Sequence, residues 1–303
     1  MCSIGEKGTQ CLNLKGSIFP YKYDMENSEF DSLVLSGGSL NGIIILGALQ
    51  YLKDKNLINN IKIFVGTSVG AVIGYLIIIG YTPVEIIVYL CTNYKLFEKL
   101  KCINIVNATR GEGAVSFSGI SEELEKMTID KVGKLMTLHD LEVRFEKKFI
   151  CVTYNTTKSC PEYLSAETNP DLPCLSALRM SSNLPLVFES YKYGDSFYVD
   201  GGLTNNFPLD IAEKYGKKVM GISLSYNMSE DNPNKNFLEF IYKLLYVPIA
   251  QSIFHRIQNK ASTSTVIEIH TGNMNFFDFD VNAKTKLEMF SKGYEDTKKY
   301  FEE

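Results

Sequence analysis

Short apolar and β-branched runs alternate along this chain with longer segments in which apolar residues recur at helical spacing. We expect strands at Ser32–Ser36, Lys62–Gly66, Lys148–Tyr154, Phe197–Val199, Lys217–Leu224 and Thr265–Ile269. We expect helices at Ile43–Lys55, Val69–Ile79, Pro83–Leu100, Ser121–Met127, Leu175–Ser182, Leu209–Lys214, Asn236–Gln258 and Ala283–Phe301. Strands that alternate with helices need crossover connections, which produce a largely parallel sheet between helical layers. The pattern therefore predicts an α/β protein with a mostly parallel central sheet.

A single domain is expected from residue 30 to residue 303, because no Pro-, Gly- or Ser-rich linker and no internal repeat divides this part. We expect residues 1–29 to be a less regular N-terminal lead-in and residues 100–119 to be a loop-rich excursion. One helix start is well marked: Thr82-Pro83-Val84-Glu85 combines an N-cap, a proline at the first helical position and a glutamate three residues after the cap.

Charge and cysteine content argue against several classes of function. The 303 residues carry a net charge of -4 and have a pI of about 5.6, without the basic stripe that nucleic acid requires. The seven cysteines are odd in number and widely spaced, with no C-x-x-C pair. Neither a disulfide framework nor a zinc site is therefore expected. We predict no nucleic-acid partner and no metal, and the sequence does not indicate an oligomeric state.

The segment Ile63–Tyr81 bears on localisation, because it has no charge and approaches membrane-spanning length. Gly66, Thr67 and Ser68 interrupt it early, which favours a buried strand, a tight turn and a buried helix. The first residues lack an apolar run behind a basic start, so no signal peptide is expected. These features predict an intracellular protein, cytoplasmic or peripheral to membranes, without a transmembrane helix.

Gly66-Thr67-Ser68-Val69-Gly70 matches the pattern G-x-S-x-G between an expected strand and an expected helix. In this pattern the glycines make room for a sharp turn that exposes a serine at the carboxyl end of the strand. The helix that follows directs its free N–H groups and its positive end toward the serine oxygen. The sequence therefore predicts that Ser68 is a nucleophile.

Gly37-Gly38-Ser39-Leu40-Asn41-Gly42 makes a second strand-to-helix turn, which can present backbone N–H groups to an anion. It lacks the Lys and Ser/Thr of a phosphate-binding loop, and it does not match G-x-G-x-x-G. An oxyanion formed during acyl transfer needs only correctly aimed N–H donors. Because a candidate nucleophile follows one crossover later, the oxyanion interpretation is favoured.

A serine nucleophile needs a base, and two arrangements are open. The order Ser68, Asp200 and then His255 or His270 is formally that of a hydrolase triad. Each histidine, His139 included, fits an ordinary structural or surface position better. Asp200 follows a short apolar strand and precedes Gly201 and Gly202. Turn chemistry explains Asp-Gly-Gly alone, but it does not explain the Asn pair and the proline that follow.

Four ordered blocks resemble the patatin-like phospholipase family, from about Leu33 to the C-terminus. They are S-G-G-S-L-N-G at 36–42, G-T-S-V-G at 66–70, A-L-R-M-S-S-N-L-P-L-V-F at 177–188 and V-D-G-G-L-T-N-N-F-P at 199–208. The last expected helix, with Gly293-Tyr294, is also similar to the family. Each block alone is weak, but the ordered set is specific.

The resemblance implies a three-layer α/β/α fold and a lipid acyl hydrolase of the phospholipase A or lysophospholipase type. It implies a Ser–Asp dyad in place of a triad, with Ser68 as nucleophile and Asp200 as its base. The backbone N–H groups of Gly37, Gly38 and Ser39 match the family's oxyanion hole. The substrate would be a fatty-acyl ester of a phospholipid, lysophospholipid or neutral lipid, hydrolysed without a metal or another cofactor.

The first glycine loop departs from the family pattern, which is usually G-G-G-x-Lys/Arg-G. Here Ser39 replaces the third glycine and Asn41 replaces the basic residue, while Gly42 is kept. Removing one oxyanion donor costs on the order of 10²–10³ in turnover, and an Asn can act as a neutral donor. The alternative to an active enzyme is therefore a catalytically reduced lipid-binding or scaffolding protein with the same fold.

The loop-rich excursion carries apolar residues that a lid or a membrane-facing patch would need: Ile103, Ile105, Val106, Val115 and Phe117. Ordinary core packing explains them equally well. A transient contact with a membrane surface therefore stays open.

Overall fold

The computed structural model describes residues 30–93, 113–227, 237–273 and 281–303. The eight strands of its sheet are β1 (Ser32–Leu35), β2 (Ile63–Thr67), β3 (Lys148–Asn155), β4 (Cys160–Leu164), β5 (Tyr191–Tyr193), β6 (Ser196–Asp200), β7 (Val219–Asn227) and β8 (Ser264–Asn273). Hydrogen bonds connect them in the order β5-β6-β3-β2-β1-β7-β8, and β4 pairs with β3 outside this path.

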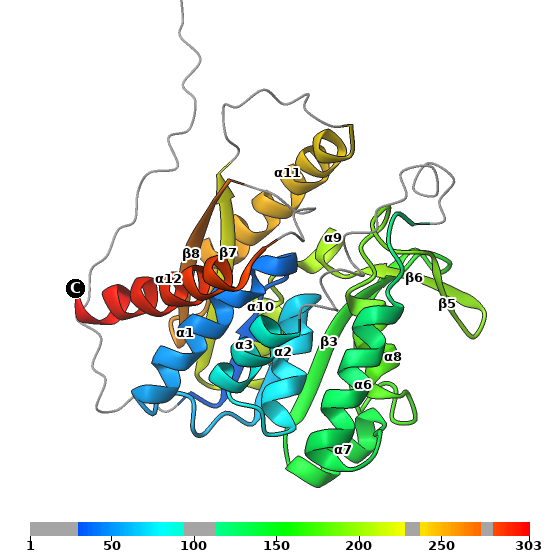
Figure 1. Cartoon of the computed structure of the whole chain (residues 1–303), viewed down its shortest axis with the longest axis horizontal. Helices are drawn as coiled ribbons and strands as arrows, with labels where there is room; N and C mark the ends of the chain where they lie inside the picture. Colours follow the sequence, from blue (N-terminus) through cyan, green and yellow to red (C-terminus); the bar gives the residue numbers. More distant parts are fainter. Residues whose placement is uncertain (1–29, 94–112, 228–236, 274–280) are drawn as a thin grey trace, which may run out of the picture.

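Helices cover both faces of the sheet (Figure 1). They are α1 (Gly42–Asp54), α2 (Val69–Ile78), α3 (Pro83–Thr92), α6 (Ser118–Val132), α7 (Leu138–Phe145), α8 (Cys174–Ser181), α9 (Gly202–Asn205), α10 (Leu209–Tyr215), α11 (Phe237–Gln258) and α12 (Ala283–Glu302), with a 3₁₀ turn at Ser39–Asn41. On one face Val34 and Val65 pack with residues of α10 and α11, and on the other Leu35 and Phe64 join the main core with α1 and α2. This alternation makes the three-layer α/β/α sandwich.

The central strands β3, β2, β1, β7 and β8 pair in parallel, which confirms the mostly parallel sheet. Buried β1 reads as the continuous apolar run that a strand covered on both faces needs. The expected capping box is also present: the Glu85 N–H donates to Thr82 Oγ1 at 3.1 Å, and the Thr82 N–H donates to Glu85 Oε2 at 2.7 Å. Local sequence chemistry therefore sets both the sheet core and this helix start.

Some expectations differ from the structure or lie outside it. All six expected strands occur, but β4, β5, α7 and α9 are not among the expected elements. The lead-in 1–29, the end of the expected helix Pro83–Leu100 and most of the 100–119 excursion lie outside the described residues. The domain division at residue 30 stays a prediction.

No single helix in the described part of the chain is long and apolar enough to cross a membrane. Only α2 and α3 taken together, bent by 118° at their junction, have the length and composition of a broken span.

Helices α1 and α12 cross where two glycines let their backbones touch (Figure 1). A Cβ atom on Gly47 would lie 1.9 Å from the Phe290 carbonyl oxygen, and one on Gly293 would lie 1.9 Å from the Ile44 carbonyl oxygen. No side chain fits between backbones at this distance, so this contact requires glycine on both helices.

We therefore expect Gly47→Ala to lower the free energy of unfolding by about 1–3 kcal/mol, because the added methyl group forces the helices apart. Gly74→Ala in α2 is the matched control: its Cβ would meet atoms no closer than 3.8 Å, and alanine favours a helix by about 1 kcal/mol over glycine. Urea denaturation of both variants measures the difference. Equal stability of the two variants would contradict the close crossing.

Candidate active site

Ser68 lies in a sharp turn between β2 and α2, with φ 53° and ψ -125°. This left-handed backbone is costly for a non-glycine residue, on the order of 1–3 kcal/mol, and is typical of functional sites. A Cβ on Gly66 would lie 2.6 Å from the Ala71 nitrogen, and one on Gly70 would lie 2.4 Å from the Leu35 oxygen. The spacing G-x-S-x-G therefore has a steric cause, because the turn brings backbone against backbone on both sides of Ser68.

Hydrogen bonds from other elements hold the turn. The Ser68 N–H donates to Ser181 Oγ at 2.9 Å, and Ser181 Oγ donates to the Val152 carbonyl oxygen at 2.6 Å. Thr67 Oγ1, one residue before the nucleophile position, donates to the Asn205 carbonyl oxygen at 2.8 Å. The sequence did not single out Ser181, although it belongs to the third family-like block.

Strand β3 places Asp200 beside this turn. Thr67, the last residue of β2, pairs with Val152, and Asp200, the last residue of β6, pairs with Thr153. Strand β4 occupies the opposite edge of β3, since it pairs with both Val152 and Thr153. The ends of β2 and β6 therefore meet along one edge of β3, one residue apart in register.

The structure brings the Ser68 and Asp200 side chains together in a hydrogen bond. Asp200 is 3% exposed, and its Oδ1 also accepts the Gly202 N–H at 2.7 Å. Burial raises the Asp200 pKa to about 6, while the hydrogen bonds from Ser68 and Gly202 oppose the rise. A carboxylate with this pKa is ionised at neutral pH and still takes up a proton readily.

Gly201 and Gly202 are required by close approaches at this turn. A Cβ on Gly201 would lie 2.3 Å from the Val152 oxygen, and one on Gly202 would lie 2.6 Å from Asn206 Oδ1. The Asp-Gly-Gly sequence is thus more than a favourable turn, because a Cβ at Gly201 would collide with the β3 backbone and one at Gly202 would lie 2.9 Å from Asp200 Oδ1.

The first glycine loop lies next to Ser68, since a Cβ on Gly37 would be 3.4 Å from the Ser68 Cβ. One expectation is corrected here. The Gly37 N–H donates to the Asn206 carbonyl oxygen at 3.0 Å, so its single hydrogen is already used. The other two expected donors, Gly38 and Ser39, both line the cavity at Ser68. Ser39 has φ 50°, the left-handed backbone that the glycine of the family pattern would adopt without strain.

The residue that replaces the basic position, Asn41, hydrogen-bonds through its side chain to the Tyr226 hydroxyl group. Gly42 faces α2, where its Cβ would lie 2.4 Å from Val69 Cγ2. These two residues therefore connect the loop to β7 and to the helix that follows Ser68.

None of the three histidines lines the cavity at Ser68. His139, His255 and His270 are exposed, and His270 Nδ1 pairs with Ser225 Oγ at 2.5 Å. The open triad alternative therefore has no geometric support, and the side chain that lies beside Ser68 is that of Asp200.

An apolar cavity of about 250 Å³ begins at these polar groups. Ser68, Asp200, Gly38, Ser39 and Asn206 lie at its polar part. The remainder is lined mainly by aliphatic and aromatic side chains of α1, α2, α3 and α6, among them Leu46, Val72, Leu76, Ile86, Leu124 and Met127. The cavity can therefore hold a long apolar group with one end at Ser68.

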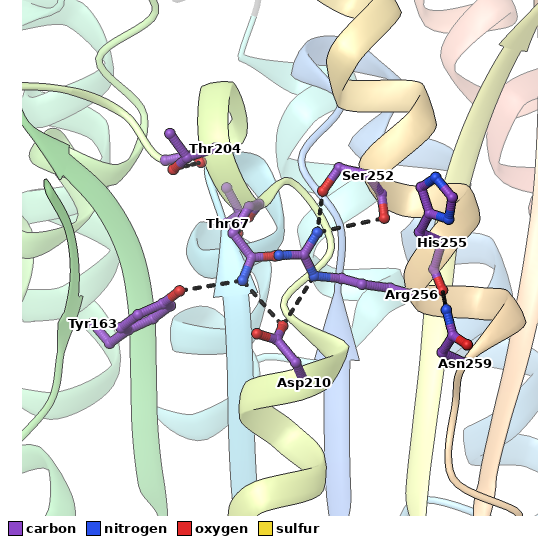
Figure 2. Close-up of polar contacts among 10 residues, drawn as sticks. Thr67, Tyr163, Thr204, Asp210, Ser252, His255, Arg256 and Asn259 are labelled. Atoms are coloured by element: carbon purple, nitrogen blue, oxygen red, sulfur yellow. Dashed lines mark hydrogen bonds and ion pairs between the residues drawn. The ribbon is translucent and has the colours of Figure 1, made fainter.

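A polar network on the other side of the sheet supports the turn after Asp200 (Figure 2). Asn205 Nδ2 donates to Asp210 Oδ1 at 3.1 Å and to Tyr163 Oη at 3.4 Å. Arg256 of α11 donates through Nε to the same Asp210 oxygen at 3.1 Å, and Figure 2 shows this contact between α10 and α11. Since Thr67 binds the Asn205 carbonyl oxygen, the network connects α11 to the turn at Ser68. The sequence offered no signal for Asp210 or Arg256.

Comparison with known proteins agrees with this geometry. The family model described as patatin-like phospholipase matches residues 33–213. The chain therefore belongs to the patatin-like phospholipase family.

Two viral relatives and one solved structure are similar to the chain. The protein named probable lipid hydrolase 463L, from invertebrate iridescent virus 6, is 38% identical over 205 residues, which cover 66% of this chain and 69% of the relative. The uncharacterized protein R571 of Acanthamoeba polyphaga mimivirus is 27% identical over 297 residues, covering 90% and 94%. The crystal structure of VipD from Legionella pneumophila has a TM-score of 0.53 and 17% identity, covering 90% of this chain and 67% of VipD. The VipD likeness supports the fold alone.

The raised Asp200 pKa predicts a pH-dependent cost in stability. The folded-state pKa of about 6 exceeds the unfolded value of about 3.9, so the native state holds this proton more tightly. The contribution of Asp200 to stability is therefore greatest below pH 4 and is lost as pH rises to about 6, by on the order of 3 kcal/mol. Asp200→Asn should raise the free energy of unfolding at pH 8, and the gain should shrink as pH falls from 6 to 4.

Asp195→Asn is the control, because it removes an exposed carboxylate in the turn between β5 and β6. Urea denaturation of the three proteins between pH 4 and pH 8 measures the effect. An Asp200→Asn protein that is less stable than wild type at pH 8 would show that burial of this charge carries no cost.

Proposed function

We propose that this protein hydrolyses fatty-acyl esters of lipids, with Ser68 as nucleophile and Asp200 as its base. Family membership assigns the reaction class, a serine hydrolase acting on lipid ester bonds. The observation that carries the residue roles is the hydrogen bond between Ser68 and the buried Asp200, at the polar part of an apolar cavity.

The first half of the reaction forms an acyl-enzyme. Asp200 accepts the hydroxyl proton of Ser68 as Oγ attacks the ester carbonyl carbon, and the carbonyl oxygen becomes an oxyanion. The Gly38 and Ser39 N–H groups stabilise this charge. When the oxyanion collapses, the bond to the alcohol breaks, and the alcohol leaves with the proton from Asp200.

Water completes the turnover. It gives a proton to Asp200 as its oxygen attacks the acyl-enzyme carbonyl carbon, and a second oxyanion forms in the same place. Ser68 then leaves with the proton from Asp200, and the fatty acid is released. A carboxylate is a weak base at its ordinary pKa, but burial at this site raises the pKa to about 6, which brings it nearer to the operating pH.

The cavity supports an acyl-chain substrate. Asp200, Gly38 and Asn206 line it together with Ser68, while Leu76, Ile86 and Met127 are among its many apolar lining residues. An acyl chain that fills this space removes apolar surface from water, worth about 0.8 kcal/mol for each buried CH₂ group. The chain would occupy the cavity and the alcohol portion would face its opening, which accommodates phospholipids, lysophospholipids and neutral lipids alike.

Contact with a membrane surface stays a prediction. Val115 and Phe117 are 4% and 2% exposed and pack with Val187 and Phe188, so they serve the core and do not form a patch. Ile103, Ile105 and Val106 lie outside the described residues. The lipid nature of the substrate is what supports a transient contact.

Turnover of a panel of phospholipid, lysophospholipid, triacylglycerol and short soluble esters tests the proposal. Ser68→Ala and Asp200→Asn should each lower kcat by a factor of about 10³ or more, because they remove members of one proton-transfer unit. A variant with His139, His255 and His270 all changed to Gln is the control, and it should keep wild-type turnover.

Lost activity in the histidine variant, or full activity in either dyad variant, would reject the dyad. A folded wild-type protein that binds these lipids and hydrolyses none of them would favour the scaffolding alternative that Ser39 and Asn41 raise.

A further inference from the structure

The two candidate oxyanion donors are held through the carbonyl groups behind them. The Gly37 carbonyl oxygen accepts Asn206 Nδ2 at 3.5 Å. The Gly38 carbonyl oxygen accepts the Tyr226 hydroxyl at 3.1 Å and the Asn41 N–H at 3.0 Å. Side chains from two other segments, one after β6 and one on β7, therefore hold this loop.

Because each peptide group is planar, these contacts also fix the directions of the N–H groups. The carbonyl group of Gly37 and the N–H group of Gly38 belong to one trans peptide, so they point in opposite directions. The same holds for the Gly38 carbonyl group and the Ser39 N–H group. A hydrogen bond that fixes either carbonyl group thus fixes the direction of the N–H group on the far side of that peptide.

The Tyr226 hydroxyl is well placed for this task. Its single hydrogen goes to the Gly38 oxygen, so Asn41, which also bonds this hydroxyl, must donate from its side-chain amide. The Tyr226 ring is 8% exposed and meets the Tyr246 ring edge-on, with centroids 5.2 Å apart and an interplanar angle of 86°. The ring is held on one side by Tyr246 and its hydroxyl is held by Gly38 and Asn41.

Asn206 holds the neighbouring peptide from the other side. Its backbone oxygen takes the Gly37 N–H at 3.0 Å while its side chain reaches the Gly37 oxygen, so one residue contacts both polar groups of Gly37. The Asn206 side chain also fills the space where Gly37 and Gly202 lack a Cβ atom. It therefore sets the loop against the turn that carries Asp200.

We infer that Tyr226 and Asn206 are positioning residues, which aim the Gly38 and Ser39 N–H groups at the oxyanion that forms on Ser68 attack. The inference rests on the proposed function. It also gives Asn41 a role in this chain: in place of a basic side chain near the oxyanion, Asn41 donates the hydrogen bond that holds the Tyr226 hydroxyl toward Gly38.

Tyr226→Phe tests the inference, because it keeps the ring and removes only the hydroxyl group. We expect kcat to fall by roughly ten-fold or more, but by less than the 10²–10³-fold loss of turnover that follows removal of an oxyanion donor. KM should not change. Affinity for an acyl trifluoromethyl ketone, which forms an oxyanion-bearing adduct with a serine, should fall by the same factor. Affinity for an ether analogue of the substrate should not change.

Tyr75→Phe is the matched control. It removes another buried hydroxyl group, which pairs with Thr128 Oγ1 at 3.0 Å away from the cavity lining. This variant should lose comparable thermal stability and keep its kcat and its ketone affinity. Asn41→Ala, at a partly exposed position, is a second test variant. Its kcat should also fall, but by less than that of Tyr226→Phe.

The outcomes separate the two proposals. Wild type without ester turnover would overturn the proposed function itself. An active wild type whose Tyr226→Phe variant keeps full kcat and ketone affinity would overturn the positioning role alone, as would equal losses of kcat in Tyr226→Phe and Tyr75→Phe. If Tyr226→Phe does not fold, unchanged kcat in Asn41→Ala would overturn it.

Discussion

The pairing of β3 with both β2 and β6 is the constraint on which the site depends. Val152 and Thr153 are consecutive residues of β3. They pair with the last residue of β2, which precedes Ser68, and with the last residue of β6, which is Asp200. Because β4 fills the opposite edge, β6 can pair only where β2 has ended. The two residues are 132 positions apart in sequence (200 minus 68), and one strand brings them within a hydrogen bond.

This arrangement costs stability at the same points where it supports chemistry. Ser68 has a left-handed backbone, Asp200 is a buried carboxylate, and glycines at 66, 70 and 201 allow backbone contacts that no side chain permits. The cost is offset by the surrounding core, in which β1 and α1 are buried almost throughout. A buried base beside a strained nucleophile is the trade-off that enzymes commonly make between stability and activity.

Sequence patterns could predict the parts of the site that local geometry dictates. Ser68 stands in a strand-turn-helix whose glycines are sterically required, and Asp200 precedes two glycines for the same reason. The supporting residues could not be predicted, since Ser181 reaches Ser68 across 113 positions and Tyr226 reaches Gly38 across 188. The expectation for Gly37 was wrong for a similar reason, because its N–H is used by the distant Asn206. Strands β4 and β5 could not be predicted either, because β4 contains Pro161 and β5 has only three residues. Each becomes a strand through pairing with its neighbour in the sheet.

The pH dependence of Ser68 phosphonylation tests the central claim most directly, that a buried carboxylate activates this serine. The wild-type chain would be treated with an alkyl fluorophosphonate between pH 4 and pH 9, and mass spectrometry would locate and quantify the label. We predict a label on Ser68 whose rate of formation rises with pH around a midpoint near 6, the raised pKa of Asp200. This labelling should be lost in Asp200→Asn. A label on another residue, or an unchanged midpoint in Asp200→Asn, would contradict it.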